Sequence, residues 1–497
     1  MKEKTVNSRR VKIAFALFSI SLLAGCTSIP EDLGRNDVDE IIRDSTGLEQ
    51  LDRSRELNRV LENDLTVDTS VRIALLKNPQ LRAKMAELGF GAADVYQAAR
   101  IRNPILSASV FDSTEPGSRD QITFGLVASF TDLLTLGKRS RLAKAEYAAL
   151  RQHVAHEAIV VVKNAQSSYH AYAAAREIAE LRDYAAYSAD VSFRLAQRFF
   201  DAGNITSREL NIAAANAVEA KLASLSANAN EAAARAELAA ILGLDASLDW
   251  QLDSGIKIPI GTKKNYDELL AQAQTNRLDF SAAKAAVDQI AEQHGLTQWS
   301  RWIDEFELGY ERERETDGKR LGGPTLDWAL PLISQNRDQV LRVQARLEQA
   351  IVALDETGLR ISNEVWLGHQ ALLNAAERLE LLASRLLPAR MQATRQAQEE
   401  EAFMLIGVFE VLDSKQQEFD AIEHYIESLK DYWVAHAELS YAVGKQLDRE
   451  DDCQVFKFSD QLSESANDHQ HHHNHNAKEA PVEDKHEHQR RHEGSHH

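Results

Sequence analysis

The amino-acid sequence predicts a mainly α-helical fold with a small β part, in which long antiparallel coiled-coil helical hairpins accompany four short strands. Three observations predict it: an internal repeat, two very long stretches almost free of glycine and proline, and short segments of alternating apolar and polar residues. Ala, Leu, Glu, Gln and Arg dominate the middle of the chain, which is the composition of long helices.

The sequence repeats itself at an offset of 201 positions. The segment GNITSREL at 203–210 corresponds to MLIGVFEV at 404–411. In the same way, AELAAILG at 236–243 corresponds to AELSYAVG at 437–444. Self-similarity of this kind indicates a tandem duplication. We expect each half to contain a helix, two short strands, a very long helix, a tight turn and a second helix.

This order predicts the organisation of the chain. The helices that open the two halves are expected at about 66–101 and 267–300. The expected segments are a signal peptide (1–25), an N-terminal extension (26–63), a first repeat (64–250), a second repeat (251–450) and an acidic, His-rich tail (451–497).

Four segments alternate apolar and polar residues with the period of a strand. They are 105–111 and 122–130 in the first repeat, and residues around 304–311 and 325–330 in the second. Strands with one apolar face suit the wall of a membrane-spanning barrel. An amphipathic hairpin on a soluble domain would show the same period, so alternation alone leaves both interpretations open.

The helices between these elements are expected to be unusually long. From 133 to 202 there is no proline and Gly137 is the only glycine, which predicts about 100 Å of helix at 1.5 Å per residue. From about 337 to 404, apolar residues recur every three or four positions, a spacing that indicates coiled-coil packing. Pro388 is the one proline in that stretch and is expected to kink the helix.

The N-terminus has the features of an export signal. Five basic residues within the first twelve precede an apolar run at 13–24, which is shorter than the ~20 residues of a membrane-spanning helix. The segment 23–26, LAGC, resembles the bacterial lipobox, which implies that Cys26 is lipidated and becomes the mature N-terminus. Thr27 at the next position implies sorting to the outer membrane. An ordinary secretory signal with a chance cysteine is the alternative.

Composition excludes several classes of function. The formal net charge of −19 makes a nucleic-acid partner improbable, because phosphate binding requires clustered Lys and Arg. No Walker loop, CxxC or GxSxG motif is present, so we expect neither an enzyme nor a cofactor. His153 and His156 lie three positions apart but lack a third ligand nearby, and we interpret them as surface residues.

The turns that end the two long helices differ in chemistry. Gly203, Asn204 and Ile205 form a polar turn before the capping box TSRE at 206–209. The second turn contains Leu405, Ile406, Gly407 and Val408, and is apolar where an exposed helical hairpin should be polar. It is either buried against the protein itself or a docking surface. We favour docking, because exposed apolar patches mark partner contacts.

Together, these features resemble the TolC-type outer-membrane efflux factor family over roughly residues 64–446. RIRNPILSAS before the first strand is one of the specific segments, and MLIGVFEVLDSKQQ and YIESLKDYWVAHAEL resemble its heavy-metal-resistance subgroup. The resemblance implies a homotrimer in which four strands per chain form a 12-stranded β-barrel, continued by a periplasmic α-helical tunnel. It also implies a periplasmic adaptor (membrane fusion) protein and an inner-membrane pump as partners, and an outer-membrane lipid environment. Both turns are the expected adaptor-docking tips, with Gly203, Asn204 and Ile205 in the first and Leu405, Ile406, Gly407 and Val408 in the second.

The resemblance assigns roles to acidic residues. Opposite the apolar strand faces, Glu305, Glu307, Glu311 and Asp327 are expected to line the pore and favour cations. Glu399, Glu400 and Glu401 precede the apolar turn and are either a gate at the closed end or a solvated helix face.

The C-terminal tail is rich in histidine, a common ligand of transition-metal ions. Ten of the seventeen histidines lie in the last twenty-nine residues, among them His469, His471, His472, His473 and His475. Imidazoles bind transition-metal ions, so we expect loose chelation and efflux of heavy-metal cations. The alternatives are multidrug efflux, the outer-membrane channel of type I protein secretion, and a lipid-anchored scaffold without a pore.

Overall fold

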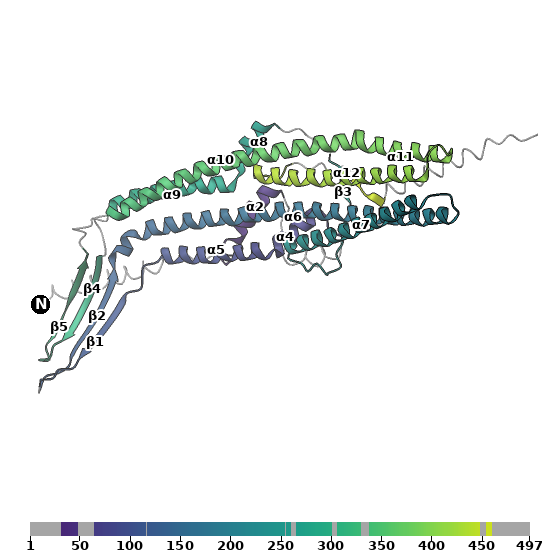
Figure 1. Ribbon diagram of the computed structural model, residues 1–497. Helices are drawn as coiled ribbons and strands as arrows, with labels where there is room; N and C mark the ends of the chain where they lie inside the picture. Colours follow the sequence, from purple (N-terminus) through teal and green to yellow (C-terminus); the bar gives the residue numbers. More distant parts are fainter. Residues whose placement is uncertain are drawn as a thin grey trace, which may run out of the picture.

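The computed structural model describes residues 31–47, 64–115, 117–253, 255–259, 265–300, 306–329, 337–447 and 454–459. These residues form an elongated molecule with a sheet at one end, from which two layers of long helices extend (Figure 1). The helices end in two turns at the far end, which we call the tips. The expected mainly α fold with a small β part is confirmed.

The first repeat forms one helical layer and half of the sheet. Helix α5 packs beside the part of α6 nearer the sheet, and α7 packs beside the part nearer the tip (Figure 1). Its elements are α4 (Val67–Lys77), α5 (Pro79–Ala98), β1 (Ile105–Phe111), β2 (Gln121–Ser129), α6 (Phe130–Asp201) and α7 (Ser207–Leu242).

The second repeat has the same order. Its elements are α8 (Tyr266–Asn276), α9 (Leu278–Ser300), β4 (Phe306–Arg314), β5 (Arg320–Trp328), α10 (Arg337–Leu381), a π-helical turn (Leu382–Leu386), α11 (Leu387–Ala402) and α12 (Val408–Val443). Pro388 lies in the first turn of α11, directly after the π-helical turn, so the helix is interrupted where its proline predicts. Outside the repeats lie α2 (Arg35–Thr46) and β6 (Val455–Phe456), and β3 (Ile256–Lys257) lies at the start of the second repeat.

The internal duplication is visible in the helix ends. Helices α7 and α12 have 36 residues each. Gly243 ends α7 with φ of +64°, and Gly444 ends α12 with φ of +74°. A side chain at either position would meet the chain that joins the first two helices of its own repeat. The two glycines are therefore required both by the backbone angle and by a close approach.

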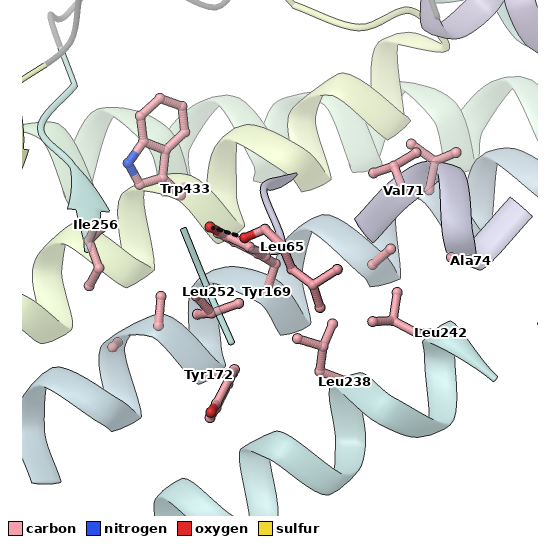
Figure 2. Close-up of a cluster of buried hydrophobic side chains, with 14 of the residues drawn as sticks. Leu65, Val71, Ala74, Tyr169, Tyr172, Leu238, Leu242, Leu252, Ile256 and Trp433 are labelled. Atoms are coloured by element: carbon pink, nitrogen blue, oxygen red, sulfur yellow. Dashed lines mark hydrogen bonds between the residues drawn. The ribbon is translucent and has the colours of Figure 1, made fainter. Parts of the chain in front are cut away.

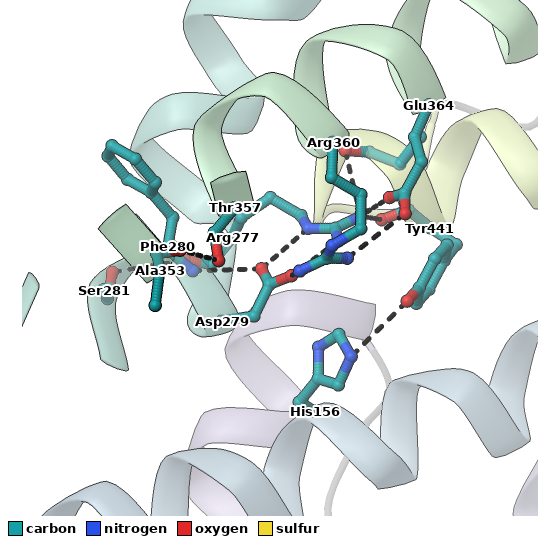
Figure 3. A network of polar contacts seen from close by, with 11 residues as sticks. His156, Arg277, Asp279, Phe280, Ser281, Ala353, Thr357, Arg360, Glu364 and Tyr441 are labelled. Carbon is teal, nitrogen blue, oxygen red and sulfur yellow. Dashed lines mark hydrogen bonds and ion pairs between the residues drawn. The ribbon is translucent and has the colours of Figure 1, made fainter. Parts of the chain in front are cut away.

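Each helix expected to open a repeat is in fact two helices, which corrects the ranges 66–101 and 267–300. Asn78 separates α4 from α5, and its Nδ2 donates to the carbonyl of Ile241, 2.9 Å away at the end of α7. Arg277 separates α8 from α9, and its Nη1 donates to the carbonyls of Tyr441 (3.3 Å) and Ala442 (3.4 Å) at the end of α12 (Figure 3). Each break thus satisfies carbonyls at the end of a distant helix.

The main hydrophobic core lies midway along α6, where α4, α7, α12 and β3 meet it (Figure 2). Leu65 enters this core and accepts a hydrogen bond from the Tyr169 hydroxyl at 3.3 Å. Trp433 of α12 donates from Nε1 to the carbonyl of Lys257, 2.7 Å away, and so holds β3 against α12. Among the described residues, no helix is both long and apolar enough to cross a membrane.

Candidate functional site

The sheet joins the two repeats. Its strand order is β1-β2-β4-β5, and each neighbouring pair is antiparallel. The central pair β2–β4 links the first repeat to the second. Strands β1 and β5 have one neighbour each within the described chain, so their outer edges carry backbone groups that no strand of this chain pairs.

One face of the sheet is apolar and exposed. The register aligns Leu106 with Leu126, and Leu126 with Tyr310. Leu308 is aligned with Leu326 on the same face. These five side chains are between 44% and 74% exposed. A sheet face of this kind is unfavourable in water and requires an apolar environment or a protein partner.

The opposite face carries carboxylates. Glu307 pairs directly with Asp327, and Glu311 lies further along the same face of β4. Glu313 also shares this face, and its carboxylate accepts a hydrogen bond from Gln121 of β2. Glu305, which the sequence places with this set, lies outside the described residues. Like charges directly opposite each other destabilise a sheet, so the Glu307–Asp327 pair is not explained by folding stability.

An aromatic cluster and an ion-pair cluster form the junction between sheet and helices. The ring of Phe306 lies 5.4 Å from that of Phe130 and 6.2 Å from that of Trp328, between centroids. One turn into α6, the buried Asp132 accepts from Arg102 Nε at 2.7 Å and from Arg139 at 2.9 Å. The Arg102 hydrogen bond is the main reason that the pKa of the Asp132 carboxyl is lowered.

The first tip closes with glycine. The N–H of Gly203 donates to the carbonyl of Phe200, and the N–H of Asn204 donates to that of Phe199, both at 2.8 Å. These two bonds form a Schellman motif, which requires the left-handed backbone that Gly203 adopts at φ of +76°. Thr206 and Glu209 then form the expected capping box of α7.

The second tip has the same backbone but a different residue. Met404 lies 201 positions after Gly203 and is also left-handed, with φ of +58°. Its N–H donates to the carbonyl of Glu401 at 2.8 Å, and that of Leu405 donates to the carbonyl of Glu400 at 2.9 Å. A left-handed conformation costs an L-residue about 1–2 kcal/mol, so the geometry of the turn favours glycine over methionine at this position.

The second tip is exposed. Phe403 is 78% exposed, Met404 92% and Leu405 73%, so this turn is not buried against the rest of the chain. Ile406 and Val408, which the sequence analysis also predicts as docking residues, are only partly exposed. Phe403 and Met404 were not among the predicted docking residues. The sequence could have identified both, because four consecutive apolar residues at 403–406 follow a polar helix.

Glu399, Glu400 and Glu401 form the last turn of α11 and are exposed. Their backbone carbonyls accept the hydrogen bonds that close the second tip. Carboxylates are unfavourable at the C-terminal end of a helix because the helix dipole is negative there. The cluster therefore destabilises its own helix end, as expected for residues retained for a purpose other than folding.

The remaining predicted site residues are not brought into one site. Cys26 and the five histidines at 469–475 lie outside the described residues. His153 is exposed, whereas His156 is partly buried and accepts or donates a hydrogen bond with the Tyr441 hydroxyl at 3.4 Å, which corrects the surface assignment of His156. The described residues contain no group of three or more His, Cys, Asp or Glu arranged to bind a metal ion.

Comparison with solved structures identifies the same fold in outer-membrane channels. CusC, described for its transmembrane channel formation, superposes with a TM-score of 0.64 at 17% identity, covering 77% of this chain and 92% of that chain. The outer membrane protein VceC from Vibrio cholerae gives 0.62 at 18% identity, covering 77% and 97%. The open MtrE outer membrane channel of Neisseria gonorrhoeae gives 0.62 at 18% identity, covering 77% and 90%.

Sequence comparison covers a shorter part of the chain. No curated protein matches it. The family model described as outer membrane efflux protein matches residues 71–244, which contain the first repeat from α4 to the glycine that ends α7. Residues 71–244 therefore match the outer membrane efflux protein family, and the chain as a whole has the fold of solved outer-membrane channels.

Proposed function

We propose that three copies of this chain form the outer-membrane duct of a tripartite efflux system and that the duct exports heavy-metal cations. The match of residues 71–244 to the outer membrane efflux protein family supports a channel protein rather than an enzyme. The observation that supports the duct most directly is the sheet, which has an exposed apolar face, an acidic face and two open edges.

The open edges argue for three copies. A membrane interior does not hydrate unpaired N–H and C=O groups, so strands cross it only as a closed barrel. Four strands cannot close on themselves, but β5 of one copy pairing with β1 of the next closes a ring of three copies with twelve strands. In that ring the apolar face contacts lipid, and the face with Glu307, Glu311 and Asp327 lines the pore.

The acidic lining supports cation transport. Rings of carboxylates attract cations and repel anions in a water-filled pore. Planar-bilayer recordings test this role: the wild-type duct prefers K⁺ to Cl⁻, and the double variant Glu307→Gln, Asp327→Asn loses most of that preference. Glu115→Gln in the exposed loop between β1 and β2 is the control. An unchanged preference in the double variant contradicts the lining, and a protein without conductance contradicts the duct.

The second tip is the proposed contact for a periplasmic adaptor, which links the duct to an inner-membrane pump. The exposed apolar side chains of Phe403, Met404 and Leu405 support this role. Leu405→Asp should abolish resistance while the trimer still assembles. Asn204→Asp, at the equivalent position of the first tip, tests the other predicted docking turn, and Glu115→Gln in the loop between β1 and β2 is the control. Normal resistance in Leu405→Asp removes the docking role. Glu399, Glu400 and Glu401, beside this tip, are proposed as the gate.

Metal ions are the proposed cargo because two independent features favour cations: the acidic strand face and the His-rich tail. Growth of a deletion strain on copper, zinc, nickel and cobalt, beside a panel of drugs, tests the cargo. Sensitivity to drugs alone would favour multidrug efflux. Type I protein secretion remains an alternative, and accumulation of a secreted protein in the deletion strain would favour it.

The proposed attachment to the outer membrane involves Cys26 as well as the sheet. A single acyl chain binds a membrane only marginally, so a lipidated Cys26 acts together with the barrel. Mass spectrometry of the mature N-terminus should show a lipid-modified Cys26, and Cys26→Ser should remove it. An unmodified N-terminus elsewhere in the chain would favour an ordinary secretory signal.

A further inference from the structure

A trough runs along α6 toward the tips, with α7 on one side and α12 on the other. Its lining comes from positions 182–192 of α6, 212–223 of α7 and 409–419 of α12, and its volume is about 520 Å³. Sites of ~300–1,000 Å³ are large enough to enclose a ligand of drug size. Five alanines, two phenylalanines, Ile212 and Leu412 form its apolar part, and eight polar or charged residues form the rest. Nothing in the described chain fills this trough.

The last described residues, 454–459, lie at the end of the trough that is farther from the tips. We call them the C-terminal strap. Its strand β6 pairs antiparallel with β3. The side chains of Phe456 and Phe458 are almost fully buried, and the N–H of Phe458 donates to a carboxylate oxygen of Glu177 at 2.9 Å. The strap is therefore held firmly on α6.

The strap runs toward the tips. Phe456 lies against Tyr425 of α12, with 5.3 Å between ring centroids. Two residues later, Phe458 lies 5.9 Å from Tyr184 of α6, and Tyr184 contacts Phe419 at 5.8 Å. Because α12 begins at the tip, the step from Tyr425 to Phe419 leads toward it. Phe419 lines the trough, so the strap ends at its entrance.

The strap also lies on the correct side of α6. Burial raises the pKa of the Glu180 carboxyl, the charges of Glu177 and Glu231 raise it further, and the charge of Lys457 opposes them. Glu231 belongs to α7 and Lys457 to the strap. Glu180 of α6 therefore interacts with charges both on α7 and on the strap.

We propose that residues 460–466, with the sequence DQLSESA, occupy this trough and carry the His-rich stretch at 469–475 to the tips. Ten helical positions separate 419 from 409, or about 15 Å. About five extended residues or ten helical residues cover that distance. Leu462 is the only large apolar side chain of this segment and matches the apolar surface at Ile212 and Leu412.

The consequence for transport rests on the proposed function. The trough ends beside the second tip, so a segment that fills it brings imidazoles next to the adaptor-docking turn. Metal binding to those imidazoles then changes the surface that the adaptor meets. The occupancy itself needs neither a pump nor a cargo, and it is tested without either.

Cross-linking of the full-length protein in isolated membranes tests the occupancy. In a Cys453→Ser background, Leu462→Cys is combined with Ile212→Cys. The control pairs Leu462→Cys with Val218→Cys, which lies on the exposed side of the same helix. A disulfide requires Cα atoms within about 4.4–6.8 Å, so an intrachain 462–212 bond should form about tenfold faster than a 462–218 bond. Equal rates, or bonds formed only between chains, overturn the proposal.

Chemical labelling gives a second measurement on the same trough. The rate at which a maleimide modifies Ile212→Cys is compared in the full-length chain, a chain ending at residue 467 and a chain ending at residue 459. Only the last should react faster, by about tenfold. Equal rates in all three chains show an open trough and contradict the proposal. Circular dichroism confirms that each chain retains its helices, and neither measurement depends on efflux.

Discussion

Arg277 should be among the most sensitive positions of the second repeat. Its side chain is 1% exposed and lies at the break between α8 and α9 (Figure 3). The guanidinium donates to the Asp279 carboxylate at 2.9 and 2.7 Å and pairs with Glu364 at 2.8 Å. It also donates to the two carbonyls at the end of α12. Replacement by methionine keeps much of the volume and removes every one of these contacts.

The expected cost is about 3 kcal/mol. Removing one partner of a buried ion pair costs about 3–5 kcal/mol because it leaves an uncompensated charge. Arg360 still donates to Asp279 at 2.9 Å and to Glu364 at 3.2 Å in the variant, which favours the lower end. Burial alone would raise the pKa of the Asp279 carboxyl, but the two arginines outweigh burial and hold this pKa well below its ordinary value.

Hydrogen exchange measures this loss locally. A cost of about 3 kcal/mol corresponds to a fall in amide protection of about two orders of magnitude. The fall should be confined to peptides around α8, the start of α9 and the end of α12. Arg378→Met is the matched control, because the Arg378–Asp431 pair at 3.3 Å is exposed and contributes about 0–1 kcal/mol. Protection within threefold of the control would refute the assigned role of Arg277.

Three further predictions concern the tips, a buried histidine and the tail. Gly203 and Met404 both have a left-handed backbone, so Gly203→Ala should destabilise its turn by about 1–2 kcal/mol and Met404→Gly should stabilise its turn by a similar amount. Amide hydrogen exchange should therefore become faster at the first tip and slower at the second. Burial lowers the pKa of His156 in the folded protein. As the pH falls, this histidine therefore takes up a proton at a higher pH in the unfolded chain than in the folded one. Stability should be full above pH ~6.5 and decline below it, and the melting temperature of His156→Gln should change less between pH 7.5 and 5 than that of the wild type. Removal of residues 467–497 should reduce metal tolerance modestly and leave single-channel conductance unchanged; equal tolerance with and without the tail would remove its role in metal handling.

Local patterns in the sequence predicted the elements that repeat or alternate. Strand β1 occupies 105–111 as expected. A short run of this kind, followed by polar turn residues, indicates a strand rather than a helix. The offset of 201 predicted both tips and both glycine-capped helix ends. These features depend on neighbours in sequence, so a single chain suffices to find them.

The features that sequence reasoning missed depend on contacts between distant residues. Asn78 and Arg277 break helices by bonding to the ends of α7 and α12, far along the chain. A buried arginine also contradicts the usual preference of that residue for the surface. The two-residue strands β3 and β6 are too short to show a period. At the second tip, the repeat aligned Met404 with Gly203, but only the structure shows that Met404 has a left-handed backbone and an exposed side chain.

The buried phenylalanines of the strap set an energy threshold for moving the two repeats apart. Phe456 packs on Tyr425 of α12 and Phe458 packs on Tyr184 of α6, so a displacement of one helix from the other exposes buried phenylalanine. Exposing two such side chains costs about 3–6 kcal/mol. At thermal equilibrium the separated arrangement would then be populated less than about once in a hundred molecules. The separated arrangement is therefore rare in the isolated protein, and a partner makes it the dominant one only by binding it more tightly than the closed arrangement, by at least the same free energy.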